Sequence, residues 1–247
     1  MQIYFTSLLV TAAIALGVYV GESHATVLIF DQSRDAVSQS IIVPTSEGAF
    51  VQQDYGDNVT GSTVDVLGGQ FTYGNEGEGF TPNIVADYFS GGNVRLWTIQ
   101  YGDLTNVLFA SAASNTLSVR LAADPGFEVL LYHFDLASWP EADYTINGVN
   151  VFGDAATLFS QTDVLVEGDA SGPRRTEFDF ATPLSAQQLV IEIDFSNITG
   201  STQDNIGIDN IRFGQNPPAL IPIPAAAWLF GSGLLGLIGL SRRKNAA

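Results

Sequence analysis

The chain has 247 residues, of which 46% are hydrophobic and 14% charged, so it can bury a sizeable core and is not a disordered polymer. Its formal net charge of −17 excludes nucleic acid as a partner, because nucleic-acid binding needs lysine and arginine to displace phosphate counterions. The absence of cysteine excludes disulfide frameworks, thiolate metal sites and cysteine nucleophiles.

Residues 1–25 have the pattern of a secretory signal peptide. An apolar run from about Ile3 to Val20 precedes Ser23 and Ala25, the small residues that suit a signal-peptidase site. The first six residues hold no lysine or arginine, so only the α-amino group supplies the positive charge that usually begins such a leader. We expect export with cleavage after Ala25; the alternatives are an uncleaved anchor or a misassigned start.

Residues 26–214 are predicted to form one all-β domain, an antiparallel β-sandwich. Short stretches rich in Val, Ile, Phe and Tyr alternate with turn residues, and neither a sustained 3.6-residue period nor a fixed repeat occurs. Asn147-Gly148 is predicted to turn a hairpin between "DYTI" and "VNVF", as are Gly68-Gly69 and Gly91-Gly92 between their flanking strands. Further strands are expected at "TLSVRLA", "FEVLLYHFDL", "RTEFDF", "QQLVIEIDF" and "IGIDNIRF".

Motifs for catalysis are scarce in this domain. His133 is its single histidine, and no Gly-x-Ser-x-Gly elbow is present, so we interpret His133 as a histidine on the surface of a sheet. Glu192 and Asp194 point to one face of a strand, where two carboxylates can in principle hydrolyse a glycoside. In so acidic a domain, however, such pairs arise by chance on a solvated strand face.

Aromatic residues offer a binding surface instead. Trp139 precedes Pro140 and is expected in a loop, where an exposed indole ring can stack on a sugar. Trp97 is expected to pack in the core.

Oxygen-rich loops make calcium the candidate metal, since this ion takes six to eight oxygen ligands. "QDNIGIDN" gathers Asp204, Asn205, Asp209 and Asn210, and "DYGDN" is a second cluster with Asp54, Asp57 and Asn58. The alternative is that both are solvated acidic turns. No cofactor is otherwise required.

The stretches "FEVLLYHFDLASWPEADYTINGVNVFGD" and "DNIGIDNIRF" are similar to parts of jelly-roll domains in exported and carbohydrate-binding proteins. This resemblance favours a jelly roll over other sandwiches. It also implies a structural calcium between an acid of the last strand, Asp209, and one near the N-terminus, Asp31.

The C-terminal segment is predicted to anchor the chain in a membrane. Residues 215–221 form a proline-containing linker, and 222–247 combine a proline motif, an apolar transmembrane helix and the basic residues Arg242, Arg243 and Lys244. Basic residues stay on the cytoplasmic side, which places the domain outside the inner membrane. A buried helix is the alternative, but this run has almost no polar face.

The tail, with its motif Ile221-Pro222-Ile223-Pro224-Ala225, resembles the sorting tails of the PEP-CTERM class of exported bacterial proteins, in the variant whose motif is Val-Pro-Leu-Pro-Ala. The resemblance covers about 27 residues and lacks the central glutamate of the commonest form. It implies processing by an exosortase, a membrane enzyme, and says nothing about the domain.

Together these features predict a non-enzymatic surface or extracellular-matrix protein. We expect it to be exported, tethered to the inner membrane by its C-terminal helix, and associated with exopolysaccharide, with release to the cell surface or matrix after processing. Two alternatives stay open: a carbohydrate-binding module with a structural calcium, and a glycoside-active enzyme that uses carboxylates alone.

Overall fold

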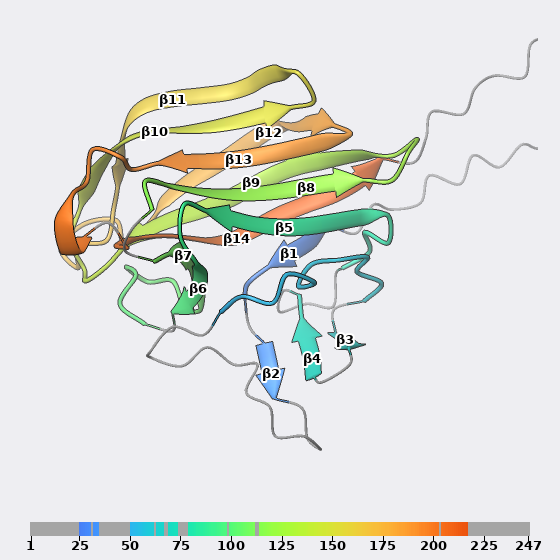
Figure 1. The fold of residues 1–247 in the computed structure, drawn as a ribbon, viewed down its shortest axis with the longest axis horizontal. Helices are drawn as coiled ribbons and strands as arrows, with labels where there is room; N and C mark the ends of the chain where they lie inside the picture. The colour runs from blue at the N-terminus through green and yellow to red at the C-terminus, as the bar shows by residue number, and fades with distance from the viewer. Residues whose placement is uncertain are drawn as a thin grey trace, which may run out of the picture.

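The structure, a computed structural model, describes residues 25–30, 32–34, 50–61, 63–66, 69–73, 79–97, 99–111, 114–202 and 204–216 (Figure 1). Within these residues the secondary structure is β-strand, apart from one short 3-10 helix, Gly200–Thr202. The strands are β1 (Thr26–Leu28), β2 (Gln32–Arg34), β3 (Thr63–Val66), β4 (Gly69–Thr72), β5 (Ile84–Ser90), β6 (Val94–Trp97), β7 (Val107–Ala110), β8 (Thr116–Ala123), β9 (Glu128–Ser138), β10 (Tyr144–Gly153), β11 (Ala156–Val166), β12 (Thr176–Ala186), β13 (Gln188–Asp194) and β14 (Ile206–Asn216).

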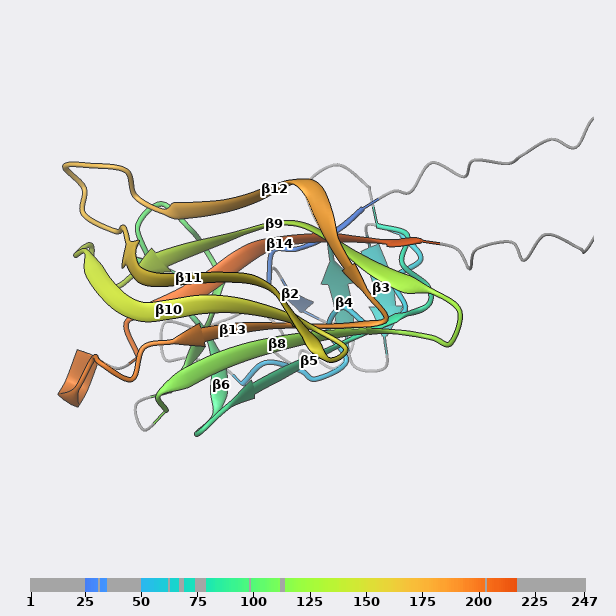
Figure 2. The same cartoon turned by 90° about the horizontal axis from the view of Figure 1, so that it is seen from above.

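Two large antiparallel sheets face each other across one core, the arrangement of a β-sandwich. The first sheet has the order β12-β9-β14-β7-β6, with β1 paired to β14, and the second has the order β11-β10-β13-β8-β5. Figure 2 shows the two layers from above. A small third sheet, β2-β4-β3, lies beside them. The predicted all-β antiparallel fold is therefore confirmed.

Alternation along the strands builds the core. In β8 every second residue is buried, and in the neighbouring β13 the buried positions match them across the ladder, with Ile191 opposite Val119. The facing sheet contributes Leu136 of β9 and Ile208 of β14 to the same cluster. Because side chains alternate between the faces of a strand, this pattern directs one apolar face of each sheet inward.

Aromatic rings join the two sheets where β11 and β12 form their edges. Phe159 of β11 meets Phe180 of β12 with ring centroids 5.3 Å apart, and Phe178 stacks on Phe134 of β9 at 4.7 Å. Such pairs add about 0.5–1.5 kcal/mol each beyond the apolar area they bury. The cluster therefore closes the sandwich between these two edge strands.

The edge of β5 is covered by the segment that contains the acidic cluster "DYGDN". The Ala86 amide donates to Asp57 Oδ1 over 2.8 Å, and Gln53 accepts from the Tyr88 amide over 3.2 Å. These side chains satisfy backbone groups that an edge strand otherwise leaves unpaired. The cluster thus completes a sheet edge in this structure.

The predicted hairpin at Asn147-Gly148 is wrong, because both residues lie inside the continuous strand β10. A side chain at Gly148 would place its Cβ 2.7 Å from the carbonyl oxygen of Gln161 on β11, so the glycine permits close approach of two strands. Asn147 Nδ2 donates to Ser196 Oγ over 2.6 Å. The β10–β11 hairpin instead turns after Gly153, which pairs with Ala156.

The other two glycine pairs have different outcomes. Strands β3 and β4 form a hairpin, as predicted, because Val66 of β3 pairs with Gly69 of β4. Gly91-Gly92 connects β5 to β6, and these strands belong to different sheets, so the predicted hairpin there is wrong.

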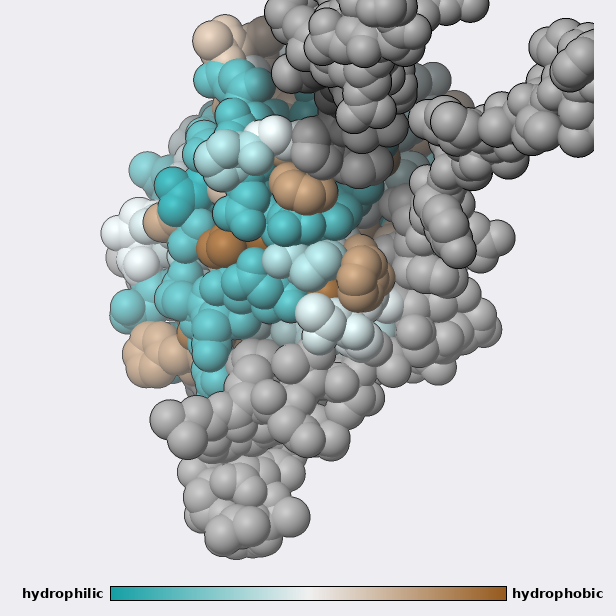
Figure 3. Space-filling view, turned by 90° about the vertical axis from the view of Figure 1, so that its right-hand side faces the viewer, coloured by the Kyte–Doolittle hydropathy of each residue, from teal (hydrophilic) through white to brown (hydrophobic). Residues whose placement is uncertain are grey.

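The two ends of the described domain lie together. Thr26 of β1 pairs with Phe213 of β14, and β14 continues through Gln215 and Asn216, which fall within the predicted linker. In Figure 3, which views this end of the sandwich, the coloured residues are mostly hydrophilic. No helix among the described residues is long and apolar enough to cross a membrane. Residues 1–24 of the predicted leader and all of the tail from 217 lie outside the described residues.

Candidate functional site

A second, smaller hydrophobic cluster lies on the outer face of the six-stranded sheet. Leu136 of β9 belongs to the main core, whereas its neighbour Ala137 belongs to this second cluster, and Leu108 and Phe109 of β7 divide in the same way. Since adjacent residues of a strand point to opposite faces, the second cluster is on the outside. We call it the outer cluster; it consists of Tyr101, Leu104, Val107, Phe109 and Ala137, with Trp97 and Trp139 packed against it.

The segment between β6 and β7 folds over this face and supplies Tyr101. The Tyr101 hydroxyl donates to the carbonyl of Asp204 over 2.5 Å. A Cβ at Gly207 of β14 would lie 2.9 Å from the Tyr101 ring and 2.8 Å from Val107. The glycine at this position therefore lets Tyr101 pack directly against the strand.

Two arginines that precede β12 hold the same segment. Arg174 Nη2 donates to the carbonyl of Gly102 over 2.7 Å, and Arg175 Nη1 lies 3.1 Å from Asp103 Oδ2. The surface ion pair is worth only about 0–1 kcal/mol. The backbones of the two segments also approach each other closely. Gly102 has φ +54°, and a Cβ at this position would lie 1.6 Å from the carbonyl oxygen of Arg174.

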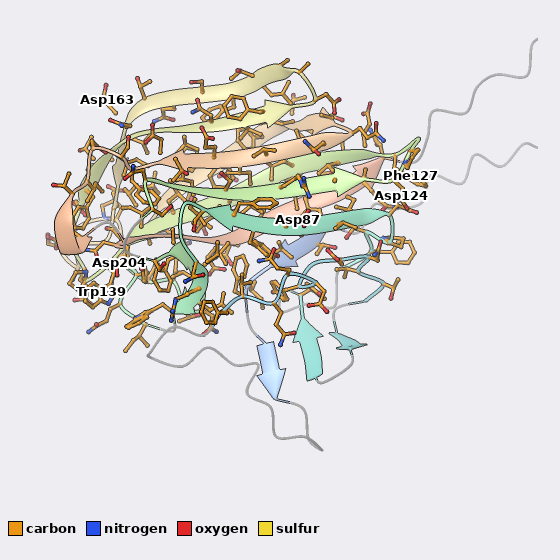
Figure 4. The ribbon with its side chains drawn as sticks, viewed as in Figure 1. Asp87, Asp124, Phe127, Trp139, Asp163 and Asp204 are labelled. Carbon is orange, nitrogen blue, oxygen red and sulfur yellow. The ribbon has the colours of Figure 1, made fainter. Side chains whose placement is uncertain are left out.

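An open pocket of about 340 Å³ lies beside the outer cluster. This volume is at the lower end of the range for ligand sites, about 300–1,000 Å³. Figure 4 shows Trp139 and Asp204 near each other at one end of the sandwich, with Asp124 and Phe127 at the opposite end. We call it the aromatic pocket; it is lined by Arg95, Trp97, Tyr101, Phe109, Ser111, Trp139, Asp204 and Asn205.

The two tryptophans meet edge to face in this pocket, with ring centroids 6.2 Å apart and an interplanar angle of 73°. Both indole Nε1 atoms are buried and have no hydrogen-bond partner among the described residues, and the same is true of Asn205 Oδ1. Asn205 itself is 1% exposed, and its Nδ2 donates to Tyr144 over 2.8 Å. Buried polar atoms are nearly always paired, by protein, water or ligand. These three atoms are enclosed within the wall of the pocket rather than exposed on its open side.

The charges of the pocket balance. Arg95 contributes a guanidinium whose Cζ lies 4.4 Å from the ring centroid of Phe50, and Asp204 contributes a carboxyl group. Burial raises the pKa of Asp204, and burial, followed by the charge of Asp204, raises the pKa of Tyr101 well above its ordinary value. Both shifts mean that the pocket disfavours additional negative charge.

Trp139, the residue predicted from the sequence to contact a glycan, lies in this pocket and is partly exposed. The expectation that Trp97 packs in the core is wrong, since Trp97 is partly exposed on the outer face beside Trp139. The alternation of Arg95 and Trp97 along β6 was the one local signal that both residues share a face. Asn205 and Tyr101 had no such signal, because they reach the pocket through contacts between distant segments.

The residues of the stretch "QDNIGIDN" line two separate cavities. Asp204 and Asn205 line the aromatic pocket, whereas Asp209 and Asn210 line a separate polar cavity of about 140 Å³. That cavity also has walls from Ile29, Asp103, Leu104, Thr105 and Arg175.

The described residues alone do not form a calcium site at Asp209. Asp103 is ion-paired with Arg175, and Asn210 Nδ2 donates to Asp135 Oδ2 over 2.8 Å, so these groups are already engaged. No group of three or more acidic or histidine side chains in the described part of the chain is placed to hold a metal. Asp31, the other predicted ligand, lies outside the described residues, and calcium there stays a prediction.

His133 lies on the outer face of β9, as the sequence suggested, and is held between two carboxylates. Its Nε2 is 3.0 Å from Asp135 Oδ1, and its Nδ1 is 2.7 Å from Asp179 Oδ1. The hydrogen bond to Asp135, then that to Asp179, raises the pKa of His133 against the opposing effect of burial. With both ring nitrogens engaged, His133 is not oriented as a general base toward a nucleophile.

Glu192 and Asp194 lie half-buried on the outer face of β13, opposite the buried Ile191 and Ile193, as predicted. Asp194 Oδ1 accepts from the amide of Ser196 over 2.9 Å. Neither carboxylate lines the aromatic pocket or the polar cavity.

No known protein family and no curated protein matches the chain. The fold and the site therefore define it as an all-β protein with two antiparallel sheets and an open aromatic pocket on an outer sheet face.

Proposed function

We propose that this chain is an exported, membrane-tethered surface or extracellular-matrix protein without enzymatic activity, whose domain associates with exopolysaccharide. The observation that carries the proposal for the domain is the aromatic pocket, in which the partly exposed residues Trp97 and Trp139 meet edge to face. Sugars offer C–H faces that stack on aromatic rings, and hydroxyl groups that suit the polar residues of the lining, such as Arg95, Ser111 and Asp204.

The position of the pocket suits a tethered protein. β14 begins beside the pocket, directly after Asn205, and ends at Asn216, where the tail follows. Its eleven residues span about 35 Å at the usual rise of a strand. A domain held to a membrane through residues beyond Asn216 therefore carries its pocket at the far end, toward the surroundings of the cell.

The proposed localisation rests on sequence signals at the two ends of the chain. A signal peptide at 1–25 and the tail at 222–247 direct the domain outside the inner membrane, and the motif at residues 221–225 directs exosortase processing with later release. Strand β1 starts at Thr26, the residue that cleavage after Ala25 would make the first. Mass spectrometry of the exported protein tests this cleavage: a mature chain that still begins at Met1 contradicts it.

A jelly roll is the finer fold that we propose for the sandwich. From β8 to β10 and from β11 to β14 each successive strand lies in the opposite sheet. Repeated crossing between two sheets is typical of jelly rolls, which hold many lectin domains. A carbohydrate-binding module is accordingly the second candidate function, and it uses the same pocket.

Sedimentation with insoluble and gel-forming polysaccharides tests the association. The full chain, in a detergent without a sugar head group, should co-sediment with its polysaccharide, and Trp139→Ala should reduce binding at least tenfold if this ring is an anchor. Phe89→Ala is the matched control, because Phe89 is 44% exposed and packs under Arg120, outside the pocket. Equal loss in both variants, or none in Trp139→Ala, contradicts the proposed site.

A further inference from the structure

An exposed phenylalanine lies beside the aromatic pocket on the same face of the sheet. Phe50 is 59% exposed and forms an antiparallel bridge with Arg95 of β6, which in turn pairs with Phe109 of β7. Residues directly opposite each other on neighbouring strands share one face of a sheet. Because Arg95 and Phe109 line the pocket, Phe50 continues its lining across β6.

One face of the Phe50 ring is covered and the other is open. The Cζ atom of Arg95 lies over the ring, 4.4 Å from its centroid, yet Phe50 stays 59% exposed. Attraction between the guanidinium and the ring holds the covered face in place. The uncovered face is available to a ligand, and a flat apolar ring suits the C–H face of a sugar.

The surface from the tryptophans to Phe50 is longer than one sugar ring. Neighbouring strands lie about 4.8 Å apart, so the path from Phe109 through Arg95 to Phe50 spans about 10 Å. Along β6, Arg95 and Trp97 are two positions apart on one face, which adds about 7 Å. Arg95 belongs both to the pocket and to the contact with Phe50, so the two surfaces are continuous.

The polar groups along this surface suit an uncharged ligand. Arg95 and Asp204 bring opposite charges to the lining, and Ser111 brings a hydroxyl group. Sugar hydroxyl groups both donate and accept hydrogen bonds, so they can pair with all three types of group. The chain's net charge of −17 repels acidic polysaccharides at long range.

We infer that this face binds an internal stretch of an uncharged linear polysaccharide, with one sugar in the aromatic pocket and a further sugar of the same chain on the open face of Phe50. Arg95 lines the first subsite and supports the ring of the second. The inference rests on the proposed association with polysaccharide and adds that the site selects for chain length. Phe50 is the residue that determines this selectivity.

Titration with oligosaccharides of increasing length tests the inference. The chain has three tryptophans, so Trp228→Phe in the tail leaves only the two pocket residues as fluorescence reporters. In a detergent without a sugar head group, this full-length chain is titrated with cello-, laminari-, manno- and malto-oligosaccharides from monomer to hexamer, and with oligogalacturonates as the acidic series. At least one neutral series should bind, with an affinity that rises about tenfold from monomer to hexamer.

Phe50→Ala should remove most of this gain. We expect it to weaken the hexamer about tenfold and to leave the monomer unchanged, whereas Trp139→Ala should weaken both. Phe50→Tyr keeps the ring and should keep the gain. Phe89→Ala is the matched control, because Phe89 is also exposed, at 44%, and lies under Arg120 at 5.1 Å, but does not line the pocket. Thermal melting checks that each variant is folded.

The outcomes separate this inference from the proposed function. If the monomer binds as tightly as the hexamer, or if folded Phe50→Ala keeps the affinity for the hexamer, the second subsite is wrong while polysaccharide association stands. Equal loss for monomer and hexamer in Phe50→Ala also overturns it, because Phe50 then only supports Arg95. Tighter binding of the oligogalacturonates than of every neutral series overturns the uncharged ligand. If no series binds, the inference fails, and the proposed function fails with it only where polysaccharide sedimentation is negative too.

Discussion

Arg174 donates a hydrogen bond to the carbonyl of Gly102 over 2.7 Å, and this contact joins the segment before β12 to the turn beneath the aromatic pocket. Tyr101, the neighbour of Gly102, lines the pocket and binds the backbone of Asp204. The geometry of the pocket thus depends on a close approach of two backbones as well as on its own side chains.

Gly102→Ala should therefore destabilise the protein and disturb the pocket. The residue has φ +54°, and a Cβ would lie 1.6 Å from the Arg174 carbonyl oxygen, so the turn must move. We expect a loss of about 1–3 kcal/mol in the free energy of unfolding, together with altered tryptophan emission. Gly172→Ala is the control, since nothing lies within 4 Å of its Cβ position. Equal denaturation midpoints for the two variants would contradict this account.

His133→Gln should reduce stability most at mildly acidic pH. The folded-state pKa of His133 is raised, first by Asp135, so the protonated ring stabilises the native state. This contribution is fully present below the unfolded pKa, about 6.5, and is lost as the pH rises through the folded value. We expect a difference on the order of 1–3 kcal/mol at pH 5.5 that shrinks by pH 9. Chemical denaturation across this range checks it, and a difference that grows with pH rules it out.

Local sequence signals were sufficient for most strands but not for the connections between them. The buried alternation of β8 and β13 could be predicted, because the period of two is visible in the sequence. Asn147-Gly148 has the residues of a tight turn, yet the strand continues because Gly148 allows Gln161 to approach. That cause depends on β11, which forms a long edge strand beside β10 and has a weak local pattern.

The pocket could be predicted only in part for a similar reason. Trp139 was recognisable as a loop aromatic, but its partner Trp97 is 42 positions earlier and reaches it only through the order β9-β14-β7-β6. The acidic stretch at 203–210 suggested one metal cluster, whereas alternation along β14 and its preceding turn divides it between two cavities. Sheet order across distant segments is what the sequence alone does not supply.

Asp57→Asn should stabilise the protein at neutral pH. Burial, opposed by the hydrogen bond from the Ala86 amide, raises the pKa of Asp57 above its ordinary value of 3.8, so the ionised form is disfavoured in the native state. Asparagine keeps the Oδ1 acceptor for Ala86 without the charge. The gain should be present above the folded pKa and fade as the pH falls toward the unfolded value. Asp54→Asn, at an exposed position of the same turn, should have little effect, and melting curves at pH 7 and pH 3.5 distinguish the two.

Calcium, if it binds Asp209 and Asp31, should raise the melting temperature, because the folded state alone brings both acids together. The polar cavity beside Asp209 has Ile29 in its wall, two positions before Asp31. Chelator and Asp209→Asn should then lower the melting temperature equally, and chelator should have no effect on the variant. A melting curve of the wild-type protein that does not change with calcium or chelator eliminates the site.

Deleting residues 217–247 should leave a folded domain that is no longer held in the membrane. β14 ends at Asn216, so the deletion preserves the strands of both large sheets and their shared core. The apolar run from Ala225 to Leu240 has no polar face for water, and Arg242, Arg243 and Lys244 retain it with the domain outside the inner membrane. The full chain should first appear in the membrane fraction, whereas the truncated chain should be soluble, monodisperse and released. Pro222→Ala with Pro224→Ala should keep membrane insertion but prevent later release, because these prolines form the proposed processing motif. Aggregation of the truncated chain, or loss of its β-sheet circular dichroism, would show that the tail belongs to the fold of the domain.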